Sequence, residues 1–209
     1  MSRERRAARP RAAFGAARAS GRSAQDRARI AQATARLIAE HGITDWSAAK
    51  RKAARQLGLP EGLALPSNED VQQALTDYHA LFAGEAHAAS LETQRRAALR
   101  WMRRLERWSP LLVGGVAAGW ATAHSDVRLE LVADDPKSVE IVLAGEGVRY
   151  VALPPRPDDP DGGGADLLVE GTDASIRLSI LSPTQRRNRP RRDDEPRLAV
   201  DEVAALLDD

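Results

Sequence analysis

The chain has 209 residues, which allows one large domain or two small ones. Its hydrophobic content of 43% is too high for a disordered chain, and no stretch approaches the ~20 consecutive apolar residues of a membrane span. The sequence contains no cysteine, which excludes disulfide frameworks, Cys-ligated zinc, iron–sulfur clusters and thiol nucleophiles. We therefore expect a folded protein without a membrane segment, located in the reducing environment of the cytoplasm.

The net charge of +1 conceals an uneven distribution along the chain. Residues 1–29 contain nine Arg and two acidic residues, Glu4 and Asp26, for a net charge of +7, which leaves −6 for the remainder. Residues 1–23 are rich in Arg, Ala and Gly and show no apolar face, so we predict that they form a disordered basic tail. A solvated extension, a transit peptide and an arm that binds nucleic-acid phosphates are all compatible with this composition.

Residues 24–108 show the 3.6-residue apolar period of helices. The pair His41–Gly42 ends the first helix, and Ser67, three residues before a carboxylate, opens the third with a capping box. The fourth helix combines an apolar face with an arginine face. The four predicted helices run from about residue 24 to His41, from the Asp45–Ser47 segment to Leu57, from Ser67 through Leu81, and from about residue 86 to 108.

At Pro110 the apolar period changes to two residues, which is typical of strands and marks a boundary in the sequence. Asp135–Pro136 begins a short helix that ends near Gly145, with Asp as the N-cap and Pro at the first helical position. Residues 154–164 are predicted to form a loop, and residues 198–207 a final helix. The five predicted strands cover residues 111–113, 127–131, 148–153, 166–170 and 175–181.

Together these patterns predict an α+β fold: a helical N-terminal region followed by a small mixed-sheet α/β domain. The predicted segments are a disordered basic tail (1–23), a helical region (24–108), the α/β domain (109–185), and a charged linker with a C-terminal helix (186–209).

The segment that carries chemistry lies between the first two predicted strands. The first strand ends in Gly114–Gly115, whose missing Cβ atoms let the backbone approach a ligand, and the amides of a short following helix attract phosphate. Ser125–Asp126 then opens the second strand with a hydroxyl and a carboxylate. The pattern predicts phosphate binding at Gly114, Gly115 and Ser125 and a metal ligand at Asp126. A tight strand-to-helix turn is the simpler explanation of the glycines taken alone.

These residues resemble the nucleotidyltransferase superfamily in its minimal form. The signature of that family is an apolar strand, Gly-Gly or Gly-Ser, a helix, and then Ser-Asp-apolar-Asp. Gly114–Gly115 and Ser125–Asp126 match it at the family's spacing, and the order of elements agrees over residues 110–181. The resemblance implies a nucleotidyltransferase-type domain that binds a nucleoside triphosphate, with Mg²⁺ when active, and transfers a nucleoside monophosphate to an acceptor.

One position departs from the family pattern, because Arg128 stands where the family has its second metal carboxylate. Glu130 lies one step further on the same strand face, so Asp126 and Glu130 are the candidate catalytic carboxylates. The resemblance also implies a third carboxylate from a later strand, for which Asp166 and Glu170 are candidates. Asp126 and Asp166 are then the candidate metal ligands.

Arginine at this position has chemistry of its own, because its planar guanidinium group pairs with phosphate oxygens. Arg128 therefore favours a second hypothesis, a degenerate homologue that binds a nucleotide or an RNA end without turning it over. The alternative is a non-catalytic nucleic-acid-binding or regulatory module that uses the arginine-rich fourth helix, with Arg95, Arg96, Arg100, Arg103, Arg104 and Arg107.

A second basic cluster, Lys50–Lys52 with Arg55, lies on the second predicted helix. The first two helices loosely resemble a repressor-type helix-turn-helix, whereas a solvated helix face is the simpler interpretation. Because 28 of the 31 basic residues are Arg, arginine alone is a weak signal.

The four histidines show no metal-ligand spacing. His41 and His124 are predicted to cap helix ends, while His79 and His87 lie within helices without an evident partner. Trp101 and Trp108 share the apolar face of the fourth helix and are predicted to lie in the core.

Overall fold

The computed structural model describes residues 11–43, 45–60, 64–82, 84–154, 165–188 and 196–208, and only the backbone of residues 11–22. These residues form an α+β structure with a five-stranded mixed sheet. The chain divides into two compact units, Met1–Leu75 and Thr76–Asp209, which we call unit 1 and unit 2. The division falls inside α3 (Asn68–Phe82), so each unit contains part of this helix. None of the described helices is both long and apolar enough to cross a membrane.

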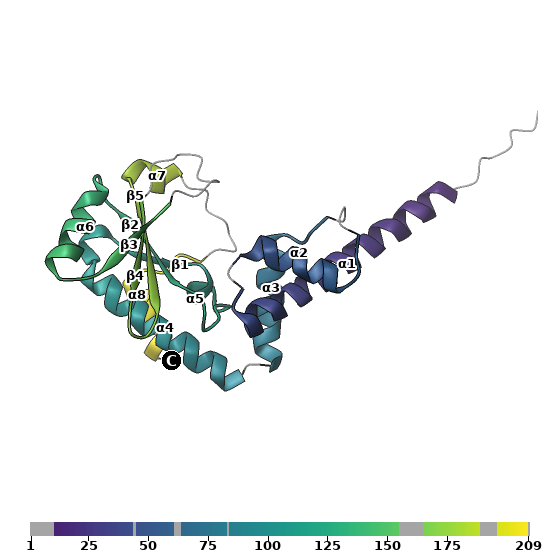
Figure 1. Cartoon of the computed structure of the whole chain (residues 1–209), viewed down its shortest axis with the longest axis horizontal. Helices are drawn as coiled ribbons and strands as arrows, with labels where there is room; N and C mark the ends of the chain where they lie inside the picture. Colours follow the sequence, from purple (N-terminus) through teal and green to yellow (C-terminus); the bar gives the residue numbers. More distant parts are fainter. Residues whose placement is uncertain are drawn as a thin grey trace, which may run out of the picture. The chain divides into compact units, whose positions relative to one another are not determined.

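Unit 1 is built around two helices, α1 (Arg11–His41) and α2 (Trp46–Gln56), which pack against each other (Figure 1). Ile30 and Leu37 of α1 are buried together with Ala53 and Ala54 of α2, and the small alanine side chains allow the helices to approach closely. Asp45 caps α2, because its carboxylate accepts a hydrogen bond at 3.0 Å from a backbone amide of the first turn.

The prediction of a disordered tail over residues 1–23 is wrong from Arg11 onward, because α1 begins there. Alanine and arginine both have a high intrinsic helix propensity, and a helix propagates readily once one part of it is fixed by packing. The sequence analysis considered only the lack of an apolar face. Residues 1–10 lie outside the described residues.

The predicted capping box at the start of α3 is confirmed. The backbone amide of Ser67 donates to the Asp70 carboxylate at 2.8 Å, and the backbone amide of Asp70 donates to the Ser67 hydroxyl at 3.0 Å. Lys50 of α2 is buried, and its Nζ donates to the side-chain oxygen of Asn68 at 2.8 Å. This hydrogen bond ties α2 to the first turn of α3.

The sheet of unit 2 has the strand order β1-β2-β5-β4-β3 (Figure 1). β2 and β5 are parallel neighbours, while every other neighbouring pair is antiparallel. The five predicted strands are confirmed, each within two residues at its ends. Their bounds are Leu111–Val113 for β1, Val127–Val132 for β2, Tyr150–Leu153 for β3, Ala165–Glu170 for β4 and Ser175–Leu181 for β5.

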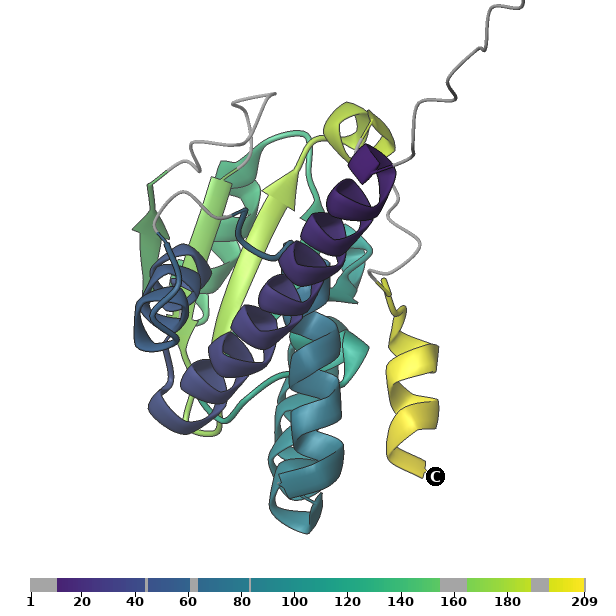
Figure 2. The ribbon, with the colours of Figure 1, turned by 90° about the vertical axis from the view of Figure 1, so that its right-hand side faces the viewer.

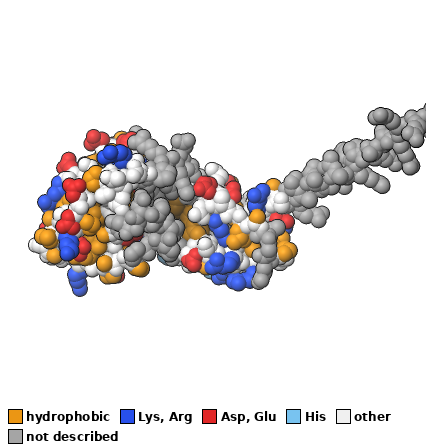
Figure 3. Space-filling view, turned by 90° about the horizontal axis from the view of Figure 1, so that it is seen from above, with side chains coloured by type: hydrophobic (Ala, Val, Ile, Leu, Met, Phe, Trp, Pro, Cys, Tyr) orange, Lys and Arg blue, Asp and Glu red, His pale blue; other side chains and the backbone are white. Residues whose placement is uncertain are grey.

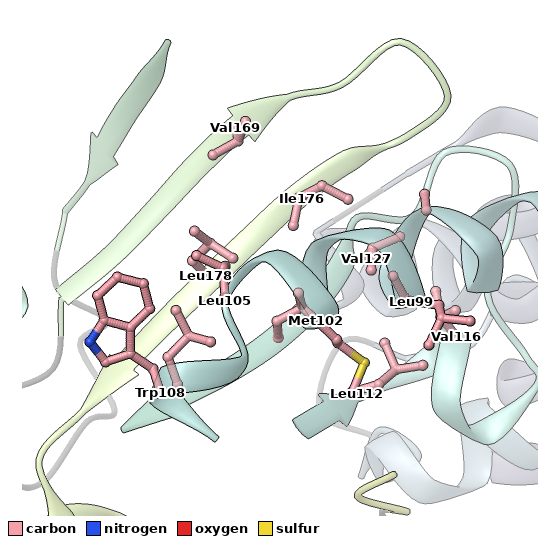
Figure 4. Close-up of a cluster of buried hydrophobic side chains, with 14 of the residues drawn as sticks. Leu99, Met102, Leu105, Trp108, Leu112, Val116, Val127, Val169, Ile176 and Leu178 are labelled. Carbon is pink, nitrogen blue, oxygen red and sulfur yellow. The ribbon is translucent and has the colours of Figure 1, made fainter. Parts of the chain in front are cut away.

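One face of this sheet is apolar and forms a single core with three helices. Figure 4 shows Leu99, Met102 and Leu105 packed against strand residues, and Figure 2 shows α8 beside α4. Val139 of α6 and Val203 of α8 belong to the same core. The helices of unit 2 after α3 are α4 (Gly84–Arg104), the 3₁₀ helix η1 (Glu106–Trp108), α5 (Gly115–Ala118), α6 (Pro136–Gly145), α7 (Pro183–Asn188) and α8 (Val200–Asp208).

The chain divides at a different place from the predicted boundary between residues 108 and 109. The fourth predicted helix, α4, shares its core with the sheet, and the C-terminal segment joins the same unit because Leu198 pairs with Leu112 of β1. The change of period at Pro110 therefore marks a change of secondary structure and not of domain. The linker predicted to start at residue 186 begins within α7, and its residues 189–195 lie outside the described residues, as does nearly all of the loop 154–164.

Candidate functional site

The face of the sheet opposite α4 carries polar and charged side chains. Successive residues of a strand point to opposite faces, so the burial of Leu129 in the core places Arg128 and Glu130 on the other side. The same alternation places Arg177 of β5 and Asp166 of β4 on this polar face. The predicted site residues lie at one end of it, where β1 ends and β2 begins.

Gly114, at the end of β1, needs to be glycine for two reasons. Its φ of 72° and ψ of −152° lie in a region that other residues essentially never adopt. A Cβ atom there would also lie 3.3 Å from Cδ of Arg128. The structure thus brings Gly114 and Arg128 together, with the arginine side chain against the glycine backbone.

Gly115 is explained by packing rather than by access for a ligand. A Cβ atom at this position would lie 2.7 Å from the ring of Trp120, closer than any real contact. The carbonyl of Gly115 accepts hydrogen bonds from the backbone amides of Gly119, Trp120 and Ala121, which closes a compact turn. The helix expected after the glycines is the single turn α5, followed by an irregular segment up to β2.

Ser125, predicted to bind phosphate, is engaged in the loop that precedes β2. Its hydroxyl accepts a hydrogen bond from the Thr122 amide at 3.0 Å and lies 3.2 Å from the Thr122 hydroxyl. Gln94 of α4 is buried, and its side-chain amide donates to the backbone carbonyls of Thr122 and Ser125 at 2.8 and 3.2 Å. Ser125 therefore fixes the loop that presents Asp126.

Asp126 lies beside two arginines. Partial desolvation raises the pKa of this carboxyl above its ordinary value, although the nearby guanidinium groups of Arg177 and Arg128 act in the opposite direction. Arg128 and Arg177 are direct register partners in the parallel pair of β2 and β5. Arg177 also donates to the Asp166 carboxylate at 2.6 Å, so both carboxylates interact with the same guanidinium group.

These residues do not fit the carboxylate clamp that Mg²⁺ requires. Arg128 occupies the second ligand position, Asp166 is held by Arg177, and Asp126 shares its surroundings with two positive charges that repel a divalent cation. Within the described ranges, no three His, Asp or Glu side chains gather as a potential metal-ligand group.

Glu130, the candidate replacement ligand, is only 4% exposed. Arg186 of α7 lies nearby: burial lowers the pKa of this guanidinium group, and the Glu130 carboxylate raises it again. Arg186 also donates to the backbone carbonyl of Ser109 at 2.7 Å. Glu130 thus belongs to a buried charge cluster beside α7. Glu170, the other candidate for the third carboxylate, is exposed at the end of β4.

The arginine-rich helix α4 packs on the opposite face of the sheet from Arg128. Arg95 is the described exception, because its Nε donates to the backbone carbonyl of Val116 in α5 at 3.3 Å. Three others form ion pairs with carboxylates: Arg96 with Glu92, Arg100 with Asp173, and Arg104 with Glu146. Trp101 and Trp108 pack on the core as predicted.

A pair of histidines was missed by the sequence analysis. The rings of His79 in α3 and His87 in α4 are stacked, with centroids 3.8 Å apart and an interplanar angle of 7°. His87 Nε2 lies 3.0 Å from the backbone carbonyl of Gly119, so the pair contacts the turn that follows α5. The signal in the sequence was the short connection between two helices, which brings their facing ends together.

No protein-family model matches the chain. The search of curated proteins also found no match.

Proposed function

We propose that unit 2 is a nucleotidyltransferase-like domain that binds the phosphate groups of a nucleoside triphosphate with arginine in place of a metal. The observation that carries this proposal is the register of β2 and β5, which makes Arg128 and Arg177 immediate neighbours on the polar face of the sheet. Neighbouring strands lie about 4.8 Å apart, a spacing at which two guanidinium groups can share the oxygens of one phosphate chain.

Two carboxylates balance these arginines when no ligand is bound. Asp166 accepts a hydrogen bond from Arg177, and Asp126 is close enough to both arginines for them to influence its pKa. Without such partners, two adjacent guanidinium groups would repel each other. An incoming phosphate chain replaces part of this compensation with stronger, charge-assisted hydrogen bonds.

Guanidinium groups bind phosphate without a divalent cation, whereas transfer by a carboxylate clamp depends on one. We therefore expect the affinity for triphosphate to be similar in Mg²⁺ and in EDTA, with no transfer of a nucleotide to an acceptor. The nucleic-acid alternative based on α4 is less well supported, because three of its arginines already have carboxylate partners.

The test is equilibrium binding of ATP and GTP to the full chain, measured in Mg²⁺ and in EDTA. Arg128→Gln should raise the Kd about 10- to 100-fold, because it removes a charge-assisted hydrogen bond worth ~1.5–3 kcal/mol. Arg103→Gln is the matched control, since it removes an exposed arginine of α4. Binding that requires Mg²⁺, turnover of the triphosphate, or equal effects of the two substitutions would contradict the proposal.

A further inference from the structure

Unit 1 carries a charge of its own that the phosphate site in unit 2 does not use. Residues 1–75 contain fourteen Lys and Arg against seven Asp and Glu, a net charge of +7, whereas residues 76–209 have a net charge of −6. A body with this excess of one sign attracts polyanions.

Part of this charge forms a defined surface on α2. Arg51, Lys52 and Arg55 are exposed, and we call these three side chains the α2 basic face. No Asp or Glu occurs within α2, and in the described part of the chain none of the three forms an ion pair. In Figure 3, blue Lys and Arg side chains gather along one side of unit 1, the body right of centre. The α2 basic face thus differs from the paired arginines of α4.

The neighbouring Lys50 shows that the burial of α2 separates these cations by role. Lys50 is 8% exposed, burial lowers its pKa against the opposing effects of Glu69 and Asp70, and its Nζ is bonded to Asn68. Lys50 therefore holds unit 1 together, while its three neighbours on the helix face solvent.

The long helix α1 extends the basic character beyond α2. Among the described side chains of α1, which start at Ser23, burial begins at Ile30. The preceding part of the helix contains five arginines and a single acidic residue, which ion-pairs with one of them; the arginines are Arg11, Arg18, Arg22, Arg27 and Arg29, and the acidic residue is Asp26. The helical backbone fixes these residues along about 28 Å at 1.5 Å per residue.

We propose that unit 1 binds the phosphate backbone of a nucleic-acid duplex through the α2 basic face and the basic half of α1. Phosphate contacts by exposed Lys and Arg supply non-specific affinity through release of counterions. A single strand is a poorer partner, because such sites stack bases on aromatic side chains and the only aromatic residue among the described side chains of unit 1 is Trp46, which is not fully exposed. A membrane surface fits less well, because the small apolar side of α2 is already buried against α1.

The test measures binding of a mixed-sequence DNA duplex to the full chain by fluorescence anisotropy between 50 and 200 mM salt. We expect log K to fall linearly with log salt, and the triple variant R51Q/K52Q/R55Q to reduce this slope by about 2 to 3, since each phosphate contact contributes ~0.9. The matched control is R96Q/R100Q/R104Q, which removes the same charge from ion-paired arginines of unit 2 and should leave the slope unchanged.

Further arms distinguish the alternatives. An RNA duplex should bind similarly, and Arg128→Gln should leave duplex binding intact, which separates this surface from the proposed triphosphate site. Equal losses in the two triple variants would overturn the proposal, because net charge alone would then explain binding. Tighter binding of a single strand or of heparin, or no duplex binding at 50 mM salt, would overturn it as well.

Discussion

The two faces of the sheet in unit 2 differ in what their side chains contribute. On the face covered by α4, Leu129 and Leu178 are fully buried in one continuous core. On the other face, Arg128, Arg177 and Asp166 balance one another's charge, and such groups contribute little net stability because they lose hydration when they are buried. The alternation of a β-strand therefore lets one face stabilise the unit while the other keeps charged groups ready for a ligand.

The largest effect should come from the apolar face. Leu129→Ala removes a fully buried side chain from the middle of β2 and should lower the free energy of unfolding by about 2–5 kcal/mol. Urea unfolding followed by tryptophan fluorescence would measure this loss. Val151→Ala is the control, because this residue of β3 is 59% exposed and should cost less than ~1 kcal/mol. Equal costs for the two substitutions would argue against the difference between the faces.

The glycine turn at the end of β1 should be the next most sensitive place. Gly115→Ala forces a methyl group into the ring of Trp120 and should cost about 1–3 kcal/mol in unfolding free energy. The double variant with Trp120→Leu should cost less than the sum of the two single changes, because the smaller side chain leaves room. Gly145→Ala serves as control, since a Cβ there meets nothing within 4 Å. Additive costs would show that the ring is not the cause.

The polar face should respond more in binding than in stability. Asp166→Asn removes the charged partner of Arg177 and should cost only about 1 kcal/mol, because both side chains remain partly open to solvent. The same change should strengthen triphosphate binding, since it frees a guanidinium group from a competing carboxylate. Calorimetry of binding together with urea unfolding would test both effects, and weaker binding would contradict the role given to Arg177.

The smallest effect is expected on the solvent side of α4. Glu92→Gln breaks an exposed ion pair with Arg96 and should change the free energy of unfolding by less than about 0.5 kcal/mol. A loss of more than ~1 kcal/mol in urea unfolding would show that the arginine face of α4 contributes to stability in its own right.

The local patterns of the sequence predicted most of the fold. Alternating apolar residues such as those flanking Arg128 located every strand, and the residues of the cap box, Ser67 and Asp70, located the start of α3. These signals succeed because they depend on neighbouring residues only. The partner of a helix face is a longer-range property, which is why the inclusion of α4 in the core of the sheet was not predicted.

The candidate site was predicted only in part for the same reason. The contact of Gly114 with Arg128 followed from a spacing of elements close in sequence, whereas Arg177 was missed because its position depends on which strand pairs with β2. Gly115 and Ser125 were assigned to phosphate, but the structure explains the first by the ring of Trp120 and the second by its hydrogen bonds to Thr122. Small and polar residues in a turn have local uses that a motif does not reveal.

The stacked histidines make the turn beside the candidate site sensitive to protons. Burial lowers the pKa of His79 in the folded chain, the neighbouring His87 lowers it further, and the backbone of Trp120 acts in the opposite direction. The unfolded chain therefore takes up a proton at a higher pH than the folded chain does, so stability is fully present above the ordinary histidine pKa of about 6.5 and declines as the pH falls through it. The decline levels off once the folded histidine is protonated too. His79→Gln should reduce the difference between urea unfolding at pH 7.5 and pH 5.5, while His41→Gln, an exposed histidine of unit 1, should leave it unchanged. Acidification thus loosens the hairpin of α3 and α4 at the point where it supports the glycine turn, and a chain that meets a mildly acidic environment would lose order there first.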